Sequence, residues 1–104
     1  MEIRELENIL EKYRVIEVLR RSPQGFFKYE APYLKIDGDI LWVIDGFTGN
    51  RTFIRLTDIH SFIGSRDISN KDIIKIRFYA DRDQVKLKMV FRCLEKVKVV
   101  DNYG

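Results

Sequence analysis

Cysteine and histidine are nearly absent from this chain: among its 104 residues, Cys93 and His60 are the only ones of their kind. One cysteine cannot form an internal disulfide. Cys93 also falls on the apolar side of a predicted strand, so we expect a buried, unreactive thiol in a protein of the reducing cytoplasm. The same scarcity excludes a zinc site built from several cysteine and histidine ligands.

Long apolar runs are missing as well. None approaches the roughly 18 residues that a membrane-spanning helix needs, and no cationic and then apolar leader follows Met1. With 45% hydrophobic and 34% charged residues, the composition is typical of a folded chain rather than a disordered one. We expect one soluble, intracellular domain over residues 1–104 with a frayed tail at 101–104. The charge-rich composition is compatible with a thermophilic source.

Motifs for catalysis are also lacking. The sequence has no glycine-rich phosphate loop, no nucleophile elbow and no metal-nuclease pattern. His60 is the single candidate general base, and the candidate nucleophiles Ser61, Ser65 and Cys93 follow no pattern that places one of them beside it. Aspartates gather at predicted turns, where backbone geometry by itself favours them. We therefore expect no catalytic residue, no metal and no cofactor, and a protein that is not an enzyme.

The first part of the chain predicts a helix followed by a strand. Apolar residues at helical spacing indicate a helix over residues 2–12. Residues 14–21 fit either structure, because their apolar positions also continue the helical stripe. The β-branched residues in that stretch, placed just before the turn at 22–25, favour a strand.

The middle of the chain predicts an antiparallel succession of strands. Extended segments at 26–30 and 33–37 are separated by Pro32, and Gly38 marks a hairpin turn into residues 40–44. Because every position of that last segment is apolar, we expect a central strand that is buried on both faces, with the N-terminal helix covering one of them. The side chains concerned are Leu41, Trp42, Val43 and Ile44.

The following segments complete the predicted fold. A loop at 45–50 precedes a strand at 51–56, then a short helical turn up to residue 63 and a polar link at 64–71. The fold class is α+β. We expect an N-terminal helix packed on a curled antiparallel sheet, or on a partly closed small barrel or roll, that ends in a β-hairpin.

The final hairpin, residues 73–93, carries the sharpest pattern, because apolar residues alternate with cationic ones on both of its strands. If Ala80 pairs with Val85, the apolar side chains face one another and Arg77 lies opposite Lys88. Like charges in that position are unfavourable by some tenths of a kcal/mol. Acidic groups of the same fold, a partner chain or a bound polyanion must compensate them.

This basic face of the hairpin suggests one function. Residues 73–104 contain eight cationic and four anionic side chains, a net charge of +4 against +3 for the whole chain. Such a face can follow a phosphate backbone, although Tyr79 is its only aromatic residue. The candidate nucleic-acid-binding residues are Lys75, Arg77, Tyr79, Lys86, Lys88 and Arg92.

An aromatic-rich segment suggests another function. Phe26, Phe27, Tyr29 and Tyr33 cannot all face one core, so some of them are expected at a protein interface. The sequence therefore predicts a non-catalytic interaction module that acts through protein contacts as a homodimer. Nucleic-acid binding by the basic face of the hairpin is the alternative.

Overall fold

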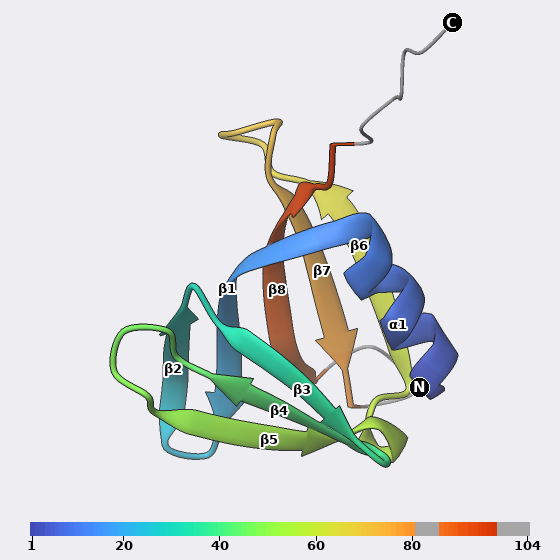
Figure 1. Cartoon of the computed structure of the whole chain (residues 1–104), viewed down its shortest axis with the longest axis vertical. Coiled ribbons are helices and arrows are strands. Elements are labelled where there is room, and N and C mark those ends of the chain that lie inside the picture. Colours follow the sequence, from blue (N-terminus) through green and yellow to red (C-terminus); the bar gives the residue numbers. More distant parts are fainter. Residues whose placement is uncertain (81–85, 98–104) are drawn as a thin grey trace, which may run out of the picture.

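The computed structural model describes residues 1–80 and 86–97 of the chain. In chain order its elements are α1 (Ile3–Lys12), β1 (Tyr13–Ser22), β2 (Gly25–Glu30), β3 (Tyr33–Asp37), β4 (Ile40–Ile44), β5 (Arg51–Arg55), the 3₁₀ helix η1 (Leu56–Asp58), β6 (Ser61–Arg66), β7 (Ile74–Tyr79) and β8 (Leu87–Glu95). All strand pairs are antiparallel. Sheet A has the order β2-β1-β8-β7-β6 and sheet B the order β3-β4-β5, as Figure 1 shows.

The predicted N-terminal helix and the strand after it are both confirmed. At the start of α1 the backbone N–H of Glu2 donates to the Glu5 carboxylate at 3.0 Å, within a capping box. The helix ends where Tyr13 adopts an extended conformation. Strand β1 follows directly and pairs with β2 on one side and β8 on the other, so its β-branched residues lie in the middle of sheet A.

The expected single, curled sheet is wrong, because the strands form two separate sheets that do not close into a barrel. The division falls at Ala31 and Pro32. Ala31 still donates its N–H to the Ile16 carbonyl at 3.0 Å, but its φ of 44° turns the chain out of the extended conformation. Proline has no N–H with which to continue the ladder. The chain therefore leaves sheet A here and begins sheet B.

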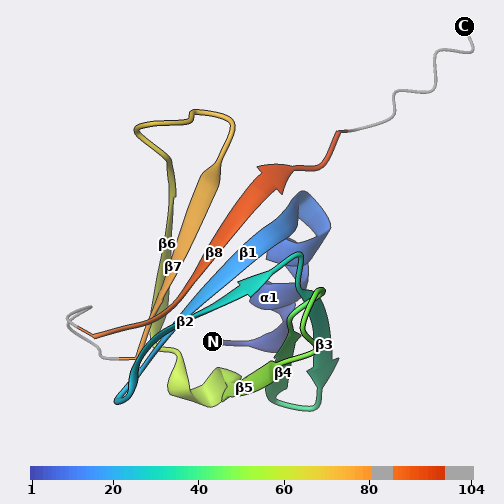
Figure 2. The same ribbon diagram turned by 90° about the vertical axis from the view of Figure 1, so that its left-hand side faces the viewer.

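The inner faces of both sheets and one side of α1 bury a single cluster of side chains. In the view of Figure 2, α1 lies between β1 of sheet A and the strands β3 and β4 of sheet B. In sheet A the rings of Phe78 and Phe91 meet edge to face, 4.7 Å apart. The cluster includes Leu6, Ile9, Val18, Leu41, Val43, Ile54, Leu56, Ile59, Ile76, Phe78, Met89, Phe91 and Cys93. The predicted burial of Cys93 is confirmed, and this burial raises the pKa of its thiol to about 12.

Strand β4 is the middle strand of its sheet, as predicted, but only one of its faces is buried. Leu41 and Val43 point into the shared core. Trp42 and Ile44 are partly exposed, which corrects the expectation that they are buried. The reason is that α1 and sheet A both lie on the inner side of sheet B, and among the described residues no element covers its outer side.

The segment after β5 was predicted wrongly in part. The helical turn is the short η1. Residues 61–63, expected in that turn, and residues 64–66, expected in the polar link, form the edge strand β6, whereas residues 67–71 lie outside the strands. Phe62 lies opposite Phe78 of β7, with their ring centroids 6.0 Å apart. Gly64 and Ser65 resemble a link in sequence, and only their pairing with β7 makes them part of a strand.

The hairpin of β7 and β8 is confirmed, but its register is not. Phe78 lies opposite Met89 rather than Leu87, and a bulge between Phe78 and Tyr79 shifts the pairing. A shift of two residues keeps each apolar side chain on the predicted face. It also changes which cations are opposed, as described below. The predicted pairing of Val85, the turn at 81–84 and the tail at 101–104 lie outside the described residues.

The loop between β4 and β5 is fastened to sheet A by the buried Asp45. Its carboxylate accepts hydrogen bonds from the backbone N–H groups of Glu30 (3.0 Å), Phe47 (2.7 Å) and Thr48 (2.9 Å). These bonds, with that from Glu30 the strongest, lower the pKa of Asp45 to about 2. The N–H of Gly46 donates to the Glu30 carbonyl at 2.9 Å, and a Cβ on Gly46 would lie 2.3 Å from the Ala31 carbonyl oxygen. The loop therefore fits closely against the junction between the sheets.

The one-sided burial of sheet B can be tested with a pair of substitutions. Leu41→Ala leaves a cavity in the core and should lower the free energy of unfolding by about 2–5 kcal/mol. Tyr33→Ala, on the outer face of the same sheet, should change it by only about 0.5 kcal/mol. Urea unfolding followed by circular dichroism measures both. Equal losses for the two variants would contradict this arrangement.

The role of Asp45 can be tested by pH. Its folded pKa of about 2 lies below its ordinary value of 3.8, so its stabilising effect is present above about pH 4 and is lost as the pH falls toward 2. Asp45→Asn should lower the melting temperature at neutral pH and flatten its decline between about pH 4 and 2. Asp58→Asn, at an exposed position, is the control and should keep the wild-type profile. An unchanged profile in Asp45→Asn would show that the carboxylate does not hold the loop.

Candidate functional site

The two central cations of the hairpin are paired within the fold. Lys75 and Arg92 lie opposite each other across β7 and β8, on the outer face of sheet A. The Lys75 ammonium is 3.4 Å from Asp67, and the Arg92 guanidinium is 3.2 Å from the buried Glu17. Glu17 also pairs with Lys28 at 3.2 Å. Acidic groups of the same chain, one of the three sources of compensation that the sequence left open, therefore lie beside both cations.

The other predicted hairpin residues occupy different surroundings. Arg77 donates to the Ser65 hydroxyl at 2.8 Å on the same outer face. Tyr79 is half-buried, Lys88 is the extra residue of the bulge, and Lys86 lies beyond it at the far end of the hairpin. The structure thus brings Lys75, Arg77 and Arg92 together, but with carboxylates among them. The outer face of sheet A is a surface of mixed charge rather than a purely cationic one.

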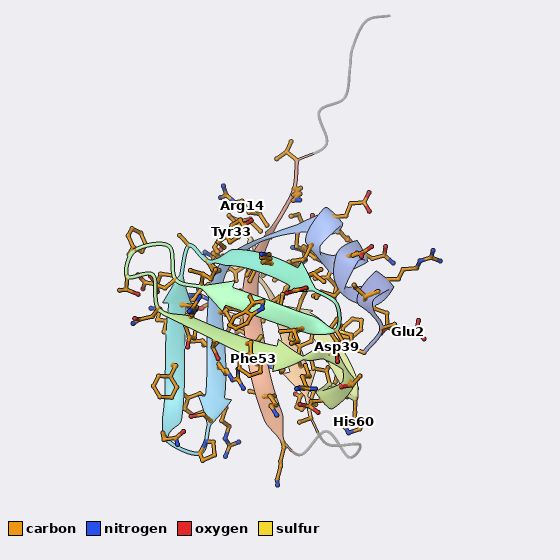
Figure 3. All side chains as sticks on the ribbon, turned by 60° about the horizontal axis from the view of Figure 1, so that its bottom comes forward. Glu2, Arg14, Tyr33, Asp39, Phe53 and His60 are labelled. Carbon is orange, nitrogen blue, oxygen red and sulfur yellow. The ribbon has the colours of Figure 1, made fainter. Side chains whose placement is uncertain are left out.

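The outer face of sheet B has a different composition. Every second residue of its three strands points outward, and the register aligns these residues in three rows across the sheet. The rows are Tyr33–Ile44–Arg51, Lys35–Trp42–Phe53 and Asp37–Ile40–Arg55. We call these nine residues the aromatic face. Figure 3 looks toward this side of the molecule, with Tyr33 and Phe53 labelled on their strands.

The aromatic rings of this face are accessible. Trp42 and Phe53 are neighbours on β4 and β5, with ring centroids 5.2 Å apart and planes inclined by 49°. Phe53 is 45% exposed and Tyr33 is 64% exposed. Tyr33 lies one row away on β3, diagonal to Trp42. Large exposed rings add little to stability, so their concentration on one uncovered face indicates an interaction surface.

Cations border these rings. The aromatic face contains three cations, Lys35, Arg51 and Arg55, and one acid, Asp37. The guanidinium of Arg51 is 5.8 Å from the centre of the Trp42 ring, within the range of a cation–π contact. The ion pairs between described side chains all lie on sheet A or its adjoining loops, so none of them neutralises these three cations.

Arg20 of β1 fixes the strand that carries Phe53. Its side chain extends from the inner face of sheet A to the edge of sheet B. There it donates to the Thr52 hydroxyl at 2.5 Å and to the backbone carbonyl of Phe53. The position of β5, and so of its outward side chains, is thereby linked to sheet A.

The predicted protein-interface residues are divided between the two sheets. Phe26 and Phe27 are exposed on the edge strand β2, and Phe26 is 68% exposed. Tyr33 belongs to the aromatic face. Tyr29 lies opposite Val18 and is buried within the chain, because strand alternation turns it toward the core. The segment therefore does not form one continuous surface.

Sequence reasoning missed most of the aromatic face. Only Tyr33 was singled out, and Trp42 was assigned to the core. The available signal was the alternation in β3 and β5, where charged or aromatic residues occupy every second position. The uniformly apolar sequence of β4 hid this signal, because it does not reveal which face of the sheet is left uncovered.

The candidate catalytic groups are dispersed. His60 is exposed, Ser65 bonds to Arg77, and Cys93 is in the core. Across residues 1–80 and 86–97, no three His, Cys, Asp or Glu side chains are placed to hold a metal ion. Nor does that part of the chain contain a helix long and apolar enough to cross a membrane. Comparison with protein-family models, curated proteins and solved structures gives no match.

Proposed function

We propose that this protein is a non-catalytic binding module for an anionic macromolecule and that the aromatic face is its binding surface. One observation carries the proposal: three large rings and three cations share the uncovered side of a sheet with a single acid. Aromatic residues and arginine are the residue types enriched at binding surfaces. The excess of positive charge favours an anionic partner.

The hairpin face supports the same function less well. Its cations Lys75 and Arg92 already have carboxylate partners at 3.4 and 3.2 Å. A bound polyanion would have to compete with Asp67 and Glu17 for them. The cations of the aromatic face can bind phosphate or carboxylate groups without breaking an ion pair with any side chain in residues 1–80 and 86–97.

Association between two copies of the chain is the second candidate, and the edge strand β2 favours it. An exposed edge strand offers unpaired backbone groups to another chain. Phe26 adds an exposed ring to this edge. Lys28, whose charge would otherwise repel a second copy, is paired with Glu17 at 3.2 Å and with Glu30 at 3.1 Å.

Two double variants with the same loss of charge test which face binds polyanions. Arg51→Gln with Arg55→Gln should elute from phosphocellulose at a lower salt concentration than wild type. The slope of log affinity against log salt should also fall by about 2, because two phosphate contacts are lost. Lys75→Gln with Arg92→Gln removes the same charge from sheet A and should elute close to wild type. Equal shifts, or a larger shift for the second variant, would reject the aromatic face.

Self-association is tested by molar mass. Light scattering at high micromolar concentration should give the mass of a dimer for the wild type. Phe26→Ser should shift it toward the monomer, since the substitution removes the exposed ring from the edge strand. Tyr33→Ser, on the aromatic face, serves as the control and should remain dimeric. A monomeric wild-type protein rules out this candidate.

A further inference from the structure

We infer that the anionic ligand is a single-stranded nucleic acid, with a base stacked on Phe53 beside Trp42 and the phosphates following β5. This inference rests on the proposed function and adds the class of the ligand. Its basis is the arrangement of rings and charges on the aromatic face. Contacts with phosphate need only the cations. The rings are therefore the feature that favours a nucleic acid with unpaired bases over other anionic ligands.

The rings are presented as a platform. Trp42 lies on the middle strand and is flanked by Lys35 on one side and Phe53 on the other. The Trp42 side chain lies on the outer face of β4. Leu41 and Val43 fill the core from the inner face of the same strand, so the Trp42 ring stays on the outer side. Phe53 leans against Trp42 and keeps nearly half of its surface accessible. An accessible ring held in this way can stack on a base of any sequence.

The charges favour one path across the face. Arg51, Phe53 and Arg55 are the three outward residues of β5, so one arginine lies on each side of Phe53. At the usual rise per residue the two arginines are about 13 Å apart, which spans a run of phosphates. Strand β3 instead carries both Lys35 and Asp37, and the carboxylate repels phosphate. The backbone of the ligand therefore follows β5, and its bases point toward β4.

Double-stranded nucleic acid fits this face poorly. The major groove, about 12 Å wide, admits an α-helix or a two-stranded β-ribbon, and the third strand of this sheet adds about 5 Å to the width of such a ribbon. Bases inside a duplex are also stacked on each other and cannot lie on a protein ring. Only an unpaired strand uses both the rings and the cations.

A protein ligand would use the same surface differently. The centre of a protein interface is enriched in aromatic residues and arginine but depleted of lysine and of acids. On the aromatic face, Lys35 lies beside Trp42 in the middle row, and Asp37 lies in the next row. Cations interleaved with rings are the pattern of grooves that track a nucleic-acid backbone.

The experiment uses the fluorescence of Trp42, the only tryptophan of the chain. Three probes are titrated: an oligothymidylate of about 12 nucleotides, its duplex with oligodeoxyadenylate, and inorganic polyphosphate, which has no bases. Stacking beside Trp42 should quench its emission with the single strand more than with the other two. Anisotropy of labelled oligonucleotides gives the dissociation constants.

Phe53→Leu is the decisive variant, because it removes the ring and keeps an apolar side chain at a half-exposed position. It should weaken binding of the single strand about 5- to 150-fold, the range for one lost base–ring stack, and change polyphosphate binding by less than about twofold. Phe26→Leu makes the same change on β2 of sheet A and should leave both affinities unchanged. Melting curves of the two variants confirm that each is folded.

The possible outcomes separate the inference from the proposed function. The inference is overturned if the duplex binds as tightly as the single strand, or if Phe53→Leu does not weaken single-strand binding. If Arg51→Gln with Arg55→Gln still lowers polyphosphate affinity in that case, the binding module for an anionic partner stands and its ligand is of another class, such as an acidic protein. If that double variant has no effect either, both proposals fail.

Discussion

One constraint governs this structure: two small sheets and one helix share a single core, so each sheet has one buried face and one face in contact with solvent. The side chains that fill the core come from all three layers. Because α1 and sheet A both lie on the inner side of sheet B, its outer side has no cover among the described residues. The exposure of Trp42 and Phe53 follows from this arrangement rather than from any local property of their strands.

The two solvent faces differ in how their charge is balanced. On sheet A, Lys75 and Arg92 lie opposite each other, and each forms an ion pair with a carboxylate of the same chain, Lys75 with Asp67 and Arg92 with Glu17. These ion pairs offset the repulsion between the two cations. On sheet B the cations lie beside aromatic rings, and only one acid shares the face. This excess of positive charge next to accessible rings directs the functional proposal to sheet B.

The same contacts that join the sheets also hold the proposed site in place. Arg20 extends from sheet A to the backbone of Phe53, and Asp45 fastens the loop that leads from β4 into β5. Both are polar groups near the boundary of the core, where hydrogen bonds are only partly shielded from water. The pairing of β4 with β5 places Trp42 beside Phe53, and the contacts of Arg20 and Asp45 hold this pair of strands against sheet A.

The sequence by itself determined the elements whose patterns are local. The helical spacing of residues 2–12, the turn at Gly38 and the alternation in the final hairpin predicted α1, the β3–β4 hairpin and the faces of β7 and β8. Those signals depend on the conformation of a few neighbouring residues. The sequence also predicted an inert Cys93, since parity alone assigns it to the core.

Only the tertiary structure decided which strand faces are covered and which charges meet. The apolar β4 fits a strand buried on both sides as well as one exposed on one side, and the choice depends on where α1 and sheet A pack. The observed register of β7 and β8 places Arg77 opposite Val90 instead of Lys88, and the pairing with β7 turned part of an apparent link into β6. These outcomes arise from contacts between residues far apart in the chain, which no local pattern encodes.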